Sequence, residues 1–180
     1  GGFIDGPALR KELVGVVRRY RPDRLLTLDP WVRYEVHPDH AVVARMACEA
    51  AAFAAFPLLH GEQLSDAVRP HSPSEVWLMG TLGRRPNTYV DITATVDTKV
   101  TAVLEFETTL AILAAMFAPE VDPANVSPRQ RDMLAGLADK WVRSMAARIG
   151  KAAGLKAAEA FFVERCLPGH FDNMDRMIGE

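Results

Sequence analysis

The chain has 180 residues, of which 49% are hydrophobic and 24% charged, a composition typical of a globular domain. The formal net charge of −2 gives no reason to expect nucleic acid or an anionic membrane surface as a partner. Its two cysteines, Cys48 and Cys166, are too few for a disulfide framework or a Cys-rich zinc module. We therefore expect one domain over residues 1–180, in the cytoplasm, with a small-molecule ligand and no membrane partner.

The first third of the sequence predicts a helix, a strand and a second helix. Apolar residues recur at helical spacing from Leu9 to Tyr20. The run RLLTL, residues 24–28, has the length of a buried strand and is closed by Asp29-Pro30. An alanine-rich helix is predicted from Pro38 to about Phe56.

The rest of the chain alternates between strand and helix patterns. The sequence predicts strands at residues 75–80 and 88–92, a long helix from Thr95 through Leu113 and another from about Pro128. Residues 158–165 are predicted as a strand or a helix, and His60 and His71 as exposed residues of an irregular connection. This alternation favours an α/β fold with a largely parallel sheet flanked by helices. Ligands of such sheets bind beyond the carboxyl ends of the strands.

The most informative stretch is EVHPDHAVVARMA, residues 35–47. Pro38 suits a first helical turn, so His37 is expected near the N-cap, with Asp39 and His40 following and both rings on roughly one side. The positive end of the helix dipole disfavours imidazolium, and neutral imidazole is the form that binds metals. However, Pro and Asp also favour a first turn for capping alone, and a zinc site needs three or four ligands. Spacing leaves both interpretations open.

A resemblance to a known family favours the metal site. The stretch LLTLDPWVRYEVHPDHAVVARMA, residues 25–47, resembles the second conserved block of the LmbE-like (PIG-L) zinc-dependent de-N-acetylases. The opening GGFIDG and the segment YVDITATVDTKVTAV resemble two other family segments, so the resemblance covers residues 1–104. It implies a Rossmann-like α/β fold and a hydrolase that uses zinc to remove an N-acetyl or N-acyl group from an amino-sugar compound.

The resemblance also implies residue roles. His40 would ligate zinc. His37 would stabilise the oxyanion or donate a proton, with Asp39 as the partner that orients its ring. Asp5 would hold a sugar hydroxyl, and Tyr34 resembles a substrate-side tyrosine of some members, one residue out of register.

The sequence departs from the family in one important respect. The family's other two zinc ligands and its general base lie in a His-Pro-Asp-Asp run, whereas this chain has a single His-Pro pair, at His37. The chain also starts at the Asp-Gly turn without Met, so we expect the C-terminal part of a deacetylase-like domain that lacks the N-terminal strand. Such a part is expected to be inactive alone, and self-association into a homo-oligomer is left open.

Two other functions stay open from the sequence. An amidase acting on thiol conjugates of amino sugars would need the same metal chemistry. A non-catalytic binding or interaction module of the same fold could keep His37 and His40 for capping and packing.

Overall fold

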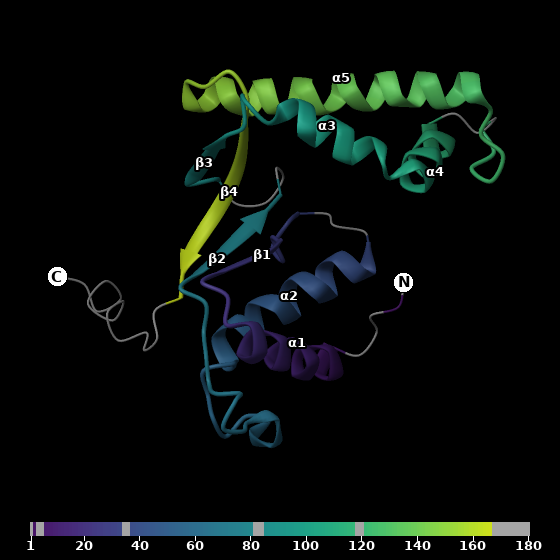
Figure 1. Cartoon of the computed structure of the whole chain (residues 1–180). Helices are drawn as coiled ribbons and strands as arrows, with labels where there is room; N and C mark the ends of the chain where they lie inside the picture. Colours follow the sequence, from purple (N-terminus) through teal and green to yellow (C-terminus); the bar gives the residue numbers. More distant parts are fainter. Residues whose placement is uncertain (1, 3–5, 34–36, 81–84, 118–120, 167–180) are drawn as a thin grey trace. The chain divides into compact units, whose positions relative to one another are not determined.

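The computed structural model describes residues 2, 6–33, 37–80, 85–117 and 121–166. Figure 1 shows the elements, which in chain order are α1 (Gly6–Tyr20), β1 (Arg24–Leu28), α2 (Pro38–Phe53), η1 (Gly61–Gln63), β2 (Glu75–Met79), β3 (Thr88–Asp91), α3 (Val96–Leu104), α4 (Glu107–Phe117), α5 (Pro128–Ala153) and β4 (Ala158–Arg165). The α/β class predicted from the sequence is confirmed, and the piece left open between strand and helix is the strand β4.

The described strands form an open four-stranded sheet in the order β1-β2-β4-β3. Strands β1 and β2 run parallel, with Arg24 opposite Glu75 and Leu28 opposite Met79. Strands β2 and β4 run antiparallel, with Glu75 opposite Arg165. The sheet is therefore mixed where the alternation of patterns predicted a largely parallel one, because strand direction depends on the path of each connection, which periodicity does not contain.

The chain divides into two compact units, residues 1–88 with 160–180 and residues 89–159. In the first unit α1 packs against α2, and α2 packs against β1. Buried alanines on α2 bring the helix close to its neighbours. One cluster of buried residues consists of Val14, Val17, Ala50 and Ala54. A second cluster consists of Ala51, Val76 and Leu78. The second unit has its own cluster of Ile92, Ala146 and Ala157. A single domain over residues 1–180 stays a prediction.

The helix predicted from Thr95 through Leu113 is two helices in the second unit. The N–H of Phe106 donates to the carbonyl of Val103 at 3.1 Å, a tight turn that ends α3, and the carbonyl of Phe106 then accepts from Leu110 as α4 begins. This difference arises because an apolar stripe can continue across a turn of this kind. None of the described helices is long and apolar enough to cross a membrane.

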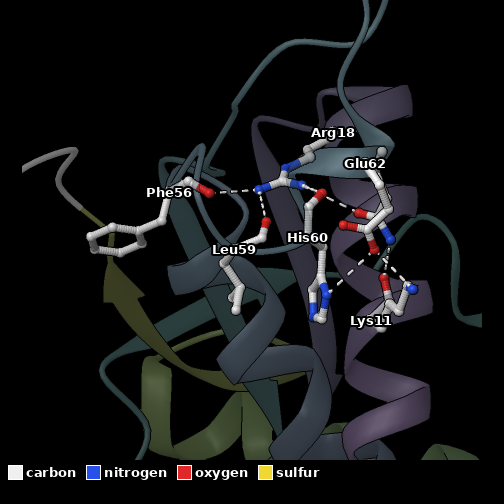
Figure 2. A network of polar contacts seen from close by, with 7 residues as sticks. Lys11, Arg18, Phe56, Leu59, His60 and Glu62 are labelled. Carbon is white, nitrogen blue, oxygen red and sulfur yellow. Dashed lines mark hydrogen bonds and ion pairs between the residues drawn. The ribbon is translucent and has the colours of Figure 1, made fainter.

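Arg18 of α1 has no exposed surface and binds the irregular connection that follows α2 (Figure 2). Its Nε donates to the carbonyl of Ala54 at 3.0 Å, and its Nη2 to the carbonyls of Phe56 at 2.7 Å and Leu59 at 2.8 Å. Its Nη1 donates to the carbonyl of His60 at 3.0 Å. Burial lowers the pKa of Arg18, but arginine remains charged at any physiological pH.

Further hydrogen bonds and an ion pair link residues near this guanidinium (Figure 2). Gln63 accepts from Arg18 at 3.3 Å and donates to the carbonyl of Lys11 at 2.8 Å. Lys11 in turn pairs with Glu62 at 2.8 Å, and its hydrogen bond lowers the pKa of that carboxyl. His60 adopts the left-handed conformation with φ of 53°, which costs about 1 kcal/mol for a residue other than glycine. The hydrogen bonds to Arg18 offset that cost.

We predict that Arg18→Met lowers the free energy of unfolding by roughly 3–5 kcal/mol, because several carbonyls lose their donor inside the protein. Urea unfolding followed by circular dichroism measures the loss. Arg19→Met is the matched control: its exposed neighbour on the same helix should change stability by less than about 0.5 kcal/mol. Equal losses in the two variants would contradict this role of Arg18.

Candidate functional site

Strand β1 ends in a tight turn around Asp29, which is only 4% exposed. The N–H of Asp29 donates to the carbonyl of Met79 on β2 at 2.8 Å. Its carboxylate accepts from the N–H of Trp31 at 2.9 Å, and its carbonyl accepts from the N–H of Val32 at 3.2 Å. An aspartate that bonds the chain two residues on is a local turn former. The turn therefore starts in a defined conformation at the carboxyl end of β1.

Gly80, which follows β2, packs directly against this turn. Its φ is 150°, and a Cβ added there would lie 2.9 Å from Cγ2 of Val32, closer than such atoms approach one another. Any larger residue would displace the turn or strain the chain. The carboxyl ends of the parallel strands β1 and β2 therefore meet at this point, which is where sheets of this class bind ligands.

His37 and His40 lie together at the start of α2, as the sequence predicts. His37 is the N-cap residue, with φ of −80° and ψ of 114°, and Pro38 occupies the first helical turn. The two imidazole rings stack with centroids 4.3 Å apart and planes at 16°. Both side chains are exposed, and the ring of His37 does not cap the helix. Neither capping by His37 nor burial in a core accounts for this pair.

Asp39 lies between the two histidines and contacts the opening of the chain. Its carboxylate accepts from the N–H of Gly2 at 3.1 Å and 3.4 Å. Gly2 is thereby held at the first turn of α2. The role of Asp39 in orienting the ring of His37 stays a prediction, and Asp5 and Tyr34 lie outside the described residues.

The described part of the chain contains no group of three His, Cys, Asp or Glu side chains placed to hold a metal ion. The stacked pair offers two imidazoles, and a catalytic zinc site usually takes three protein ligands. The donor chemistry of the pair thus suits zinc but does not complete a site by itself. The assignment of His40 as a ligand stays a prediction.

Among the described residues, the other two histidines and the two cysteines pack within the protein. His60 and His71, predicted as exposed, are both half-buried, and Nε2 of His71 lies 2.9 Å from the carbonyl of Pro22. Cys48 packs beside the cluster of Ala51, Val76 and Leu78. Burial, and the charge of Glu164, raise the pKa of the half-buried Cys166 thiol, which opposes the thiolate form needed for metal binding or nucleophilic attack.

Sequence reasoning overlooked Gly80, which packs against the turn after β1. The available signal was a glycine directly after the second strand. This pattern is not specific, because turns after strands commonly contain glycine.

Comparison with known proteins relates the chain to deacetylases. No protein-family profile matches it. Diacetylchitobiose deacetylase of Thermococcus kodakarensis is 38% identical over 99 residues, which cover 55% of this chain and 36% of that protein. The match therefore extends over about a third of that relative.

Solved structures show the same fold. An N,N'-diacetylchitobiose deacetylase from Pyrococcus horikoshii, bound to an inhibitor, matches 93% of this chain with a TM-score of 0.65 and 24% identity, and the match covers 56% of its own length. The conserved protein TT1542 from Thermus thermophilus matches with a TM-score of 0.62 and 22% identity over 93% of this chain and 65% of its own.

A third structure, the 4-carboxy-2-hydroxymuconate hydratase GalB of Pseudomonas putida, matches 94% of this chain and 65% of its own with a TM-score of 0.58 and 16% identity. At such identities the likeness shows the fold alone. The relation rests instead on the sequence match to one diacetylchitobiose deacetylase, and the fold shared with another supports it. Both findings agree with the resemblance of this chain to the LmbE-like (PIG-L) de-N-acetylases.

Proposed function

We propose that the protein to which this chain belongs is a zinc-dependent hydrolase that removes an N-acetyl group from an amino-sugar compound. The observation that carries the proposal is the stacked, exposed pair of His37 and His40 at the start of α2. The sequence match to a diacetylchitobiose deacetylase supports the same reaction. A small amino sugar carrying an acetamido group is then the expected substrate.

Each residue of the site has a proposed part in the reaction. His40 would supply one neutral imidazole to zinc, which when bound polarises an amide carbonyl and lowers the pKa of a bound water. His37 would donate an N–H to the oxygen of the amide carbonyl as negative charge develops there. Asp39 would keep the first turn of α2 and the opening of the chain in place through Gly2. Asp5 and Tyr34 remain proposed substrate contacts.

The general base and the other ligands are proposed to come from elsewhere in the protein. The family places them in a His-Pro-Asp-Asp run, and the chain spans a little over half the length of the Pyrococcus structure. Reading the complete gene for that run after an apolar strand is a direct check. Its absence from the complete gene would leave the non-catalytic module as the better proposal.

Two observations weigh on the alternatives. The exposed, stacked rings speak against a module that keeps both histidines for capping and packing, since His37 does not cap and neither ring is buried. The likeness to GalB shows that this fold also supports hydration chemistry. The amidase of thiol conjugates shares all the chemistry proposed above and differs from the deacetylase only in its substrate.

The decisive experiment measures acetate released from N,N'-diacetylchitobiose and from N-acetylglucosamine by the complete gene product. We expect release that stops when a chelator removes the metal and returns when zinc is added. Activity only on a thiol conjugate would favour the amidase. No amide hydrolysis by the zinc-loaded protein on any of these compounds would overturn the proposed function.

We predict that His40→Ala loses zinc, whereas His37→Ala keeps zinc and lowers kcat by roughly 100-fold or more. A ligand enters the metal-binding equilibrium, but a group that stabilises the oxyanion acts only as the reaction proceeds. Metal content and turnover are measured for both variants in the complete protein. Arg45→Ala, an exposed change on the same helix, is the control and should alter neither. Equal zinc loss in the two histidine variants would reverse the assignment.

We also predict that residues 1–180 alone bind zinc weakly and do not hydrolyse the amide. One or two imidazoles compete poorly with water and with protons for the metal. Titration against a chelator measures the affinity. Tight binding of one zinc per chain would mean that residues 1–180 hold a complete ligand set, and the proposed need for further ligands would then be wrong.

A further inference from the structure

The sheet of the first unit has an apolar face that points away from α2. Helix α2 packs on the face that carries Leu25, Val76 and Leu78. Successive residues of a strand point to opposite faces, so the residues that alternate with these lie on the other face. We call that other face the outer face, and its apolar residues are Leu26, Leu28, Trp77, Met79, Phe161 and Val163.

The outer face is more exposed to water than the face toward α2. Leu26, in the middle of β1, is 55% exposed, and Met79 of β2 is 38% exposed. On the face toward α2, Val76 and Leu78 are almost completely buried. Strand pairing aligns the outer face in two rows across the strands, one of Leu26, Trp77 and Val163 and one of Leu28, Met79 and Phe161. The exposed leucine and methionine are therefore parts of one continuous apolar surface.

The strand sequences have the pattern of strands that are buried on both faces. The runs VWLM in β2, residues 76–79, and AFFV in β4, residues 160–163, are apolar without a break. A sheet with one face in water has strands in which apolar and polar residues alternate. Parallel strands such as β1 and β2 are, in addition, usually covered on both faces. The sequence thus fits a covered outer face, whereas residues 1–180 leave Leu26 and Met79 exposed.

The polar groups at one end of the outer face already have partners within the sheet. Nε1 of Trp77 donates to the carboxylate of Glu75 at 2.9 Å, and Nε of Arg24 donates to the same carboxylate at 3.0 Å. The guanidinium of Arg24 also lies over the Trp77 ring, 5.3 Å from its centroid. An apolar surface can therefore cover the indole without leaving its N–H unpaired, which would otherwise oppose burial.

We propose that, in the complete protein, an amphipathic helix from outside residues 1–180 packs on the outer face. With its side chains a helix is about 10 Å across and neighbouring strands are about 4.8 Å apart, so one helix covers both β1 and β2. The occupant is argued from length: the match covers 56% of the Pyrococcus deacetylase and 36% of the Thermococcus one, so both relatives contain further residues. This inference concerns packing and does not depend on the proposed reaction.

Thiol labelling of the complete gene product measures whether the outer face is covered. Leu26→Cys should react with a thiol reagent at least about tenfold more slowly than Leu58→Cys, because a covered thiol reacts only when the packing opens. Leu58 is 96% exposed on the connection after α2 and is the matched control. Met79→Cys tests the same face independently, and the unsubstituted protein gives the background from Cys48 and Cys166. Rates for both outer-face variants within about twofold of Leu58→Cys would overturn the proposal.

Photo-cross-linking from the same position identifies what covers the face. In the complete gene product, Leu26→p-benzoylphenylalanine should cross-link to a peptide from outside residues 1–180, at the mass of a single chain. A product of twice that mass would show that a second copy covers the face, and a cross-link to another part of residues 1–180 would show that this part does. Either result overturns the proposed helix. Neither measurement uses turnover, so both leave the proposed function to be tested separately.

Discussion

A buried cation needs an acceptor for its N–H groups, and an irregular buried segment needs donors for its carbonyls. Arg18 and the connection after α2 satisfy both needs together, through the carbonyls of Ala54, Phe56, Leu59 and His60. The chain passes through this connection on its way from α2 to β2. The guanidinium thus ties α1 to the segment that joins the second helix to the sheet.

The residues of the candidate site lie in the first unit, on α2 and after β1. Buried alanines seat α2 close to its neighbours, and the start of the same helix carries His37 and His40. At the carboxyl end of β1, the hydrogen bonds of Asp29 and the lack of space at Gly80 hold the turn that bears Trp31. Chemistry-bearing groups on rigid elements lose little freedom when a ligand binds, so they bind and react more effectively.

The structural neighbours separate the fold from the reaction. Two diacetylchitobiose deacetylases and a hydratase are related to this chain in sequence or in fold. The fold therefore supplies a position, at the carboxyl ends of the parallel strands, and the side chains placed there decide the chemistry.

The sequence by itself determined the local elements and the most specific motif. Periodicity located α1, β1, α2 and α5, because helices and strands leave periods of 3.6 and 2 in the order of apolar residues. Pro38 between two histidines predicted their common side at a helix start, because a first turn has a defined geometry. These features depend on residues that are near one another along the chain.

Only the tertiary structure decided the features that join distant residues. Arg18 occupies the apolar stripe of α1 beside Val14 and Val17, but its burial depends on carbonyls about forty residues further on, which no local pattern reveals. The antiparallel pairing of β2 with β4 and the fit of Gly80 against Val32 likewise arise from the path of the chain in space. Local sequence encodes the conformation of a segment, whereas its partners are set by packing of the whole unit.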